Sequence, residues 1–191
     1  MNLLGNKNAE VLVIGCFHGD EPQGKFLIEE YLKAFPDSKL AFIPCLNEYG
    51  VCHNIRTNEN GVDLNRNFPT GNWELTEKNE FYGGSAPASE IQTRFVIDVV
   101  ENIKPKLILT LHAPFKVVNY DGDAKEISEK ISDIIGYPVE SSIGYPTPGS
   151  FGTWAGVEKG IPTITLELDE KMDVKELIKP VFEIFKLLEI Y

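Results

Sequence analysis

Two of the three histidines in this chain stand where they could share a metal ion with a nearby carboxylate. His18 and Glu21 lie three positions apart, just after an apolar run, and His112 directly follows a second apolar run at residues 107–111. Two imidazoles and one carboxylate form a ligand set that holds catalytic Zn²⁺ with one position left open for water. Such a site supports metal-assisted hydrolysis. A histidine and a glutamate at this spacing also occur by chance, so the pattern needs support from the rest of the chain.

The composition is that of an ordinary soluble protein, with 42% hydrophobic and 25% charged residues. A length of 191 residues fits one domain with a substantial core. The net charge of −11, without a basic run, argues against nucleic acids and anionic membranes as partners. No apolar stretch approaches the roughly 18 residues of a membrane span, and the first residues do not resemble a secretory signal. We therefore expect a cytoplasmic protein, and its oligomeric state stays open.

Arginine is scarce and its placement is informative. Only three arginines occur, and two of them, Arg56 and Arg66, fall within one eleven-residue window. In an acidic protein this placement indicates a local positive pocket for an anionic group.

The three cysteines form neither an even disulfide set nor a C-x-x-C pair. Cys16 and Cys45 end apolar runs, so we expect both to be buried free thiols.

Hydrophobic periodicity predicts strands alternating with helices. The expected strands span residues 10–16, 39–45, 106–112, 115–120 and 161–168, and the expected helices span 22–35, 89–102, 124–135 and 173–190. Pro22 would be the first helical residue, Ser89 and Gln92 would form a capping box with Ile91 facing inward, and Pro180 would kink or break the last helix. This order predicts a single α/β domain with a mixed, mostly parallel central sheet flanked by helices.

The long segment 46–88 is rich in Asn, Gly and Pro, and loops of this length in compact domains are usually functional. In open α/β sheets, ligands bind beyond the carboxyl ends of the strands. His18 and His112 both fall at such ends, which supports the metal-site hypothesis independently of their spacing.

Five motifs in order make the chain resemble the M14-type zinc carboxypeptidases. They are His18 with Glu21, the octapeptide at residues 61–68 (G-V-D-L-N-R-N-F), the segment at residues 82–90 (Y-G-G-S-A-P-A-S-E), His112, and Glu167 on a late apolar run. Together they cover most of the chain. Its turn at residues 47–50 departs from the N-P-D-G of the family, which leaves subsite details open.

The resemblance implies one zinc ion per chain, held by His18, Glu21 and His112. Glu167 would act as general base and Arg56 would stabilise the oxyanion.

The resemblance also implies substrate contacts. Asn65 and Arg66 would bind the terminal carboxylate of a small peptide, because a planar guanidinium makes two parallel hydrogen bonds. Tyr145 lies 22 positions before Glu167, where the family places a mobile tyrosine over the substrate.

Residues 143–156 (I-G-Y-P-T-P-G-S-F-G-T-W-A-G) resemble the murein peptide amidase branch of the family. Enzymes of that branch cleave the bond between γ-D-glutamate and meso-diaminopimelate during cell-wall recycling. The resemblance therefore predicts a zinc peptidase domain over residues 1–191 that acts on such peptides.

Several other residues carry weaker expectations. Asp63 would anchor its loop or orient a metal-ligating histidine by a hydrogen bond to the ring. The alternative is that it is a plain turn residue. His53 would be a surface or supporting residue, Trp154 would pack in the core, and residues 121–123 (D-G-D) would form a turn.

Two other functions remain open. One is an N-acyl amino acid deacylase of the aspartoacylase and succinylglutamate desuccinylase type, which shares H-x-x-E and D-L-N-R. The other is a non-catalytic protein that keeps the fold and binds peptide ends.

Overall fold

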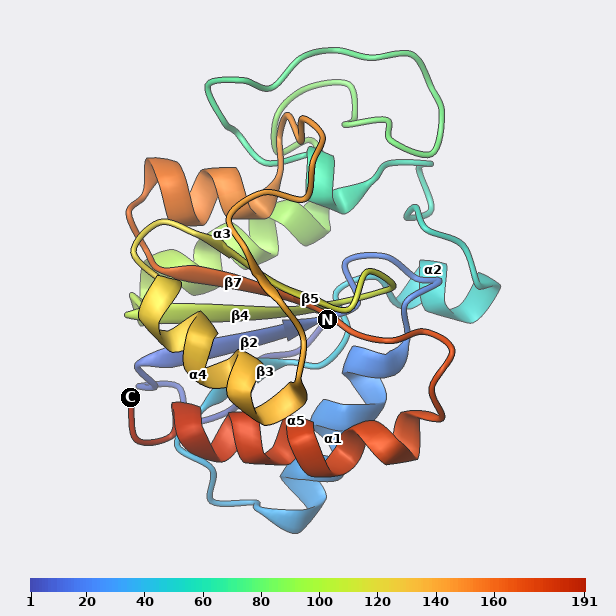
Figure 1. Ribbon diagram of the computed structural model, residues 1–191. Helices are drawn as coiled ribbons and strands as arrows, with labels where there is room; N and C mark the ends of the chain where they lie inside the picture. The colour runs from blue at the N-terminus through green and yellow to red at the C-terminus, as the bar shows by residue number, and fades with distance from the viewer.

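Seven strands form one sheet in the order β1-β3-β2-β4-β7-β5-β6, in a computed structural model that describes all residues 1–191 (Figure 1). Four neighbouring pairs are parallel, whereas β1 with β3 and β5 with β7 are antiparallel. The strands span Leu4–Gly5 (β1), Val11–Gly15 (β2), Ala41–Ile43 (β3), Leu107–His112 (β4), Val117–Asp121 (β5), Val139–Glu140 (β6) and Thr163–Glu167 (β7). The expected mixed, mostly parallel α/β sheet is confirmed.

All five expected strands are present, each within a few residues of its expected bounds. The sequence missed β1 and β6, because two residues are too short to show any periodicity. The central strands β2 and β4 are buried along their whole length. Continuous apolar runs of this kind are typical of parallel strands that are covered on both faces.

Helices cover both faces of the sheet (Figure 1). One face packs against α1 (Gln23–Ala34), α4 (Lys125–Ile135) and α5 (Val174–Leu188) through a core of 22 buried residues that includes Leu27, Ile131 and Ile184. The other face packs against α3 (Ile91–Ile103) and the π-helix η2 (Thr153–Glu158) through a core of 16, including Val96 and Trp154. Trp154 is a core residue, as expected.

The start of α3 differs from the expectation. Ile91 is 59% exposed, and the N-cap is Glu90, whose side chain makes no capping hydrogen bond. The backbone N–H of Glu90 instead donates to Asn67 Oδ1 at 3.1 Å. The predicted capping box is therefore wrong: the N-cap of the helix lies one residue beyond Ser89, its expected position, and the hydroxyl of Ser89 donates to Glu90 Oε1 instead.

The expected position of Pro22 and the expected break at Pro180 are not observed. Pro22 is the N-cap of α1 rather than its first residue. Pro180 lies inside α5, which continues without a break to Leu188. Buried residues on both sides of it, Leu177 and Val181, hold the two halves of the helix against the sheet.

The segment 46–88 contains two short elements that the sequence did not predict. The helix α2 (Glu48–His53) is capped by Asn47, whose Oδ1 accepts from the N–H of Gly50. The 3-10 helix η1 (Leu64–Arg66) is capped by Asp63. The remainder of this loop runs, cyan to green, from α2 to α3 in Figure 1. No helix is both long and apolar enough to cross a membrane.

Candidate active site

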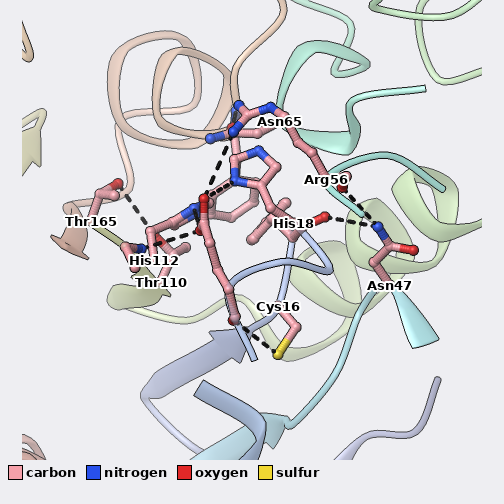
Figure 2. A network of polar contacts seen from close by, with 12 residues as sticks. Cys16, His18, Asn47, Arg56, Asn65, Thr110, His112 and Thr165 are labelled. Carbon is pink, nitrogen blue, oxygen red and sulfur yellow. Dashed lines mark hydrogen bonds and ion pairs between the residues drawn. The ribbon is translucent and has the colours of Figure 1, made fainter. Parts of the chain in front are cut away.

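Three side chains meet beyond the carboxyl ends of β2 and β4. Ligand atoms of His18, Glu21 and His112 all lie within 4.8 Å of one another. His18 Nδ1 is 2.7 Å from Glu21 Oε1, and His112 Nδ1 is 3.0 Å from Glu21 Oε2. The two imidazole rings are close neighbours in an edge-to-face arrangement, with centroids 4.9 Å apart and planes inclined by 64° (Figure 2).

The ring of His18 is oriented by Asp63, which is fully buried. Asp63 Oδ1 lies 3.0 Å from His18 Nε2. A carboxylate only accepts, so Nε2 carries the hydrogen and the lone pair of the neutral ring is on Nδ1, facing Glu21. Carboxylates commonly hold metal-ligating histidines in this way. Asp63 also accepts from the backbone N–H of Asn65 at 2.8 Å, so both structural roles considered for it are present.

The donor set fits a divalent cation. The lone pairs of two imidazole nitrogens and a carboxylate converge, and such groups attract one another only through a shared cation. In the metal-free protein a proton takes this place: burial lowers the pKa of His18, but the charges of Glu21 and Asp63 outweigh it and raise the pKa to about 9. Burial raises the pKa of Glu21, but His18 and His112 outweigh it and hold the pKa well below its usual range.

The loop that carries His18 is fixed by local backbone geometry. Cys16 has a φ of 56°, in the left-handed region. The N–H of Asn47 donates to the carbonyl of Cys16 at 3.0 Å, and the thiol of Cys16 donates to the carbonyl of Glu21 at 3.6 Å (Figure 2). A Cβ on Gly19 would collide with the backbone of Gly50 in α2. The turn after β2 is therefore held tightly against α2.

His112 and Glu167 are direct neighbours in the sheet, paired at the ends of β4 and β7. Glu167 is 6% exposed, and its Oε2 is buried without a hydrogen-bond partner. Burial raises the pKa of Glu167 above its usual range, and the opposing effect of His112 only partly offsets this. An unpaired buried carboxylate beside a metal-ligand cluster is costly for stability and indicates a functional group.

Arg56 is held beside the cluster. Its Nε and one terminal nitrogen donate to Asp63 Oδ2 at 3.0 and 2.8 Å, and its other terminal nitrogen lies 3.7 Å from Glu21 Oε1. The ring of Phe81 stacks on the guanidinium at 5.2 Å. Asn47 supports this arrangement, because its Nδ2 donates to the carbonyls of Phe17 and Arg56 (Figure 2).

Asn65 and Arg66 follow Asp63 on η1. The backbone N–H of Phe151 donates to Asn65 Oδ1 at 2.9 Å, so the Nδ2 group of Asn65 makes no hydrogen bond within the protein and can donate to a ligand. Arg66 is 7% exposed, and one of its terminal nitrogens donates to the carbonyl of Asn65 at 2.8 Å. The remaining guanidinium N–H groups make no other hydrogen bond within the protein.

All eight residues selected from the sequence line one cavity of about 670 Å³. They are His18, Glu21, Arg56, Asn65, Arg66, His112, Tyr145 and Glu167. Tyr145 lies at the mouth, 44% exposed. His53 lies outside the cavity and stacks on Tyr49. Cys16 and Cys45 are buried free thiols, as expected, and Cys52 is an exposed one.

The sequence missed Asn119 and Asp121, which also line the cavity. The segment 121–123 was expected to form a turn, but Asp121 is the last residue of β5, and only the following residues turn. The alternation of side chains along this strand, two positions apart, could have indicated that Asn119 and Asp121 face the same way.

Comparisons with known proteins place this geometry in a family. Residues 45–135 match the family model described as zinc carboxypeptidase. The chain is 31% identical over 157 residues to murein peptide amidase A of Escherichia coli strain K12, covering 75% of this chain and 64% of that protein. It is 30% identical over 181 residues to murein peptide amidase A of Vibrio campbellii, covering 84% of this chain and 70% of that protein.

A solved structure gives the same result. The crystal structure of murein-tripeptide amidase MpaA from Escherichia coli O157 matches with a TM-score of 0.83 and 27% identity, covering 97% of this chain and 83% of that chain. Nearly all of this chain therefore matches a related fold, whereas the chain covers only 64% of the length of the Escherichia coli K12 relative.

Proposed function

Since the chain belongs to the zinc carboxypeptidase family, we propose that it is a zinc-dependent peptidase that removes a residue bearing a free carboxylate from a small peptide. The observation that carries the proposal is the meeting of the three ligand atoms within 4.8 Å, in the same cavity as Glu167 and Arg66. We assign the whole of residues 1–191 to this one peptidase domain.

His18, Glu21 and His112 would hold one zinc ion per chain. A zinc ion with three protein ligands acts as a Lewis acid and promotes the ionisation of water near neutral pH. Asp63 keeps the Nδ1 lone pair of His18 free for this purpose by accepting the hydrogen bond of Nε2.

Glu167 would serve as the general base. It takes a proton from the attacking water and later delivers it to the leaving amine. The raised pKa of this carboxyl brings it closer to neutrality, which favours a group that must both accept and donate a proton. Its unpartnered Oε2 is free to meet the water, since no protein donor competes for it.

The two arginines would bind two different negatively charged groups of the substrate. Arg66 and the free amide of Asn65 bind the carboxylate of the leaving residue. Arg56, which lies next to Glu21, donates to the oxyanion of the scissile carbonyl. Tyr145, exposed at the mouth, closes over the bound substrate.

We propose murein peptides as the substrate, with cleavage between γ-D-glutamate and meso-diaminopimelate during cell-wall recycling. The similarity to murein peptide amidase A supports this choice over the N-acyl amino acid deacylase. The unpaired cysteines suit the reducing cytoplasm as the place of action.

The test is mass spectrometry of products after incubation of the zinc-loaded protein with a mixture of peptides. The mixture contains L-alanyl-γ-D-glutamyl-meso-diaminopimelate, its α-linked isomer, simple dipeptides and N-acetyl-aspartate. We expect release of diaminopimelate from the γ-linked tripeptide. Cleavage of N-acetyl-aspartate alone would establish the deacylase, and release of no product from any of these compounds would refute the hydrolase.

A further inference from the structure

Two buried cysteines meet at the base of the turn of residues 16–21, which carries two of the metal ligands. Neither cysteine takes part in the chemistry described so far. Cys16 is fully buried, Cys45 is 3% exposed, and both are free thiols. Cys16 directly follows β2 and Cys45 follows β3, and these strands are parallel neighbours in the sheet. The fold therefore brings together two thiols that are far apart in the sequence.

Backbone hydrogen bonds hold the two cysteines side by side. The N–H of Leu46 donates to the carbonyl of Gly15 at 3.1 Å, and the N–H of Asn47 donates to the carbonyl of Cys16 at 3.0 Å. Chain segments that are paired in this way lie about 4.8 Å apart. A disulfide requires Cα atoms that are about 4.4–6.8 Å apart, so the backbone at Cys16 and Cys45 permits one.

The two thiols are also in contact. A hydrogen bond between Cys16 and Cys45 and the burial of Cys45 raise the pKa of the Cys45 thiol. A thiol with a raised pKa reacts slowly, because the thiolate is the nucleophile. The pair is therefore stable in a reducing compartment and is oxidised only when an oxidant persists.

Cys16 is connected directly to the metal ligands. It precedes His18 by two positions, and its thiol donates a hydrogen bond to the backbone carbonyl of Glu21 at 3.6 Å (Figure 2). Its φ of 56° lies in the left-handed region, which is uncommon for residues other than glycine. The turn therefore depends on such contacts to keep its conformation, and a change at the Cys16 sulfur reaches Glu21.

We propose that Cys16 and Cys45 are a site of reversible oxidation, at which hydrogen peroxide converts the two thiols to a disulfide that weakens metal binding at the neighbouring turn. One sulfur attacks a peroxide oxygen, the O–O bond breaks, and a sulfenic acid and one water form. The second sulfur attacks the sulfenic sulfur, the S–S bond forms, and the S–O bond breaks to release a second water. The sulfurs together lose two electrons, the peroxide gains them, and a dithiol reverses the change. This inference goes beyond the proposed function and uses only its metal site.

The disulfide removes the hydrogen that Cys16 donates to Glu21. It also brings the two sulfur atoms to about 2.05 Å from each other, so the Cys16 sulfur moves toward Cys45. The backbone of Glu21 loses this support, and its carboxylate lies between His18 and His112. We therefore expect zinc to bind less tightly. Because the coupling between two equilibria is reciprocal, bound zinc opposes the disulfide by the same factor.

The first test detects the bond itself in Cys52→Ser, which removes the exposed thiol and leaves Cys16 and Cys45 as the only cysteines. The full-length protein is treated with hydrogen peroxide, the remaining thiols are alkylated, and tryptic peptides are analysed by mass spectrometry. Peptides 8–25 and 40–56 should be joined, and dithiothreitol should separate them. Two separate peptides with alkylated cysteines, or with sulfinic or sulfonic acids, would overturn the proposal.

The second test measures the effect on the metal site. The Kd for zinc of reduced and of cross-linked Cys52→Ser is determined by competition with a chromophoric chelator, after circular dichroism has shown that both forms are folded. We expect the Kd to be about 2- to 10-fold higher in the cross-linked form, the range that one lost hydrogen bond supports. It should return to the starting value after reduction and removal of the dithiol. Equal Kd values in the two forms would overturn the proposal.

The matched control adds Cys45→Ser to Cys52→Ser. This protein keeps Cys16 and its hydrogen bond to Glu21 but cannot form the disulfide. Its Kd for zinc should be the same before and after peroxide, and a rise equal to that of the cross-linked protein would overturn the proposal. None of these measurements depends on hydrolysis. A protein that bound zinc but cleaved none of the tested peptides would refute only the peptidase, and the two tests would still decide the role of the cysteine pair.

Discussion

Replacing Asp63 by asparagine tests how a buried carboxylate prepares His18 for the metal. Asp63 Oδ1 lies 3.0 Å from His18 Nε2, and Oδ2 accepts two hydrogen bonds from Arg56. Asparagine keeps the size but removes the charge and one acceptor oxygen. A hydrogen bond to a charged group contributes about 1.5–3 kcal/mol, and supporting residues of this kind change metal affinity by about 10- to 100-fold. We expect the Kd for zinc to rise by that factor.

The assay is a competition titration of zinc against a chromophoric chelator at pH 7.5, with far-UV circular dichroism to show that the variant is folded. Asp98→Asn, an exposed aspartate on α3, serves as the matched control and should keep the wild-type Kd. If folded Asp63→Asn bound zinc as tightly as wild type, the argument that Asp63 orients His18 would be refuted.

The same variant has a consequence for stability against pH in the metal-free protein. Burial lowers the pKa of His18, but Glu21 and Asp63 raise it to about 9, above the value of about 6.5 in the unfolded chain. A raised folded pKa stabilises the protein fully below pH 6.5, and this stabilisation, about 3 kcal/mol, is lost as the pH rises through 9. The Tm of metal-free wild type should fall over this range and that of Asp63→Asn should fall less. Equal slopes would contradict the assignment.

Three further predictions address the other groups of the site. Glu167→Gln should lower kcat by about 10²- to 10⁴-fold with zinc content unchanged, and undiminished turnover would exclude Glu167 as the base. The same variant should raise the Tm of the metal-free protein at neutral pH. The pKa of Glu167 is raised in the folded protein, which means that its ionised carboxylate destabilises the fold at that pH. Arg66→Lys should raise KM for substrates with a free carboxylate but not for their amides, and an equal effect on both would exclude the carboxylate contact. Removing zinc with a chelator should lower the Tm of wild type, since free zinc at about 100 times its Kd adds about 2.7 kcal/mol to the free energy of unfolding. The Tm of Glu21→Ala should not depend on zinc. A zinc-dependent Tm in that variant would place the metal elsewhere.

The sequence predicted most of the sheet because its central strands are buried on both faces. The run at residues 107–111 is apolar except for Thr110, and the strand that it forms is buried along its length, so the local pattern and the three-dimensional surroundings agree. The sequence pattern gave wrong helix boundaries or breaks where residues from another part of the chain contact the helix. Asn67, from the long loop, binds the backbone N–H of the N-cap residue Glu90 at the start of α3, and packing against the sheet on both sides of Pro180 kept α5 continuous. Neither contact is visible in a local window.

The site residues were likewise predicted where the local sequence was sufficient and missed where distant parts of the chain decide. His18, Glu21 and His112 were identified from their types and their positions at strand ends, and the structure brings them together. Asn119 and Asp121 were missed: alternation along the strand indicates that they face the same way, but that this face meets the cavity depends on the register of β5 against β7.

The most direct test of the account is a crystal structure of the zinc-loaded protein with an anomalous difference map collected at the zinc edge. We predict a single peak within about 2.0–2.2 Å of His18 Nδ1, His112 Nδ1 and a carboxylate oxygen of Glu21. No peak at that position, or one bound by other residues, would contradict the central claim.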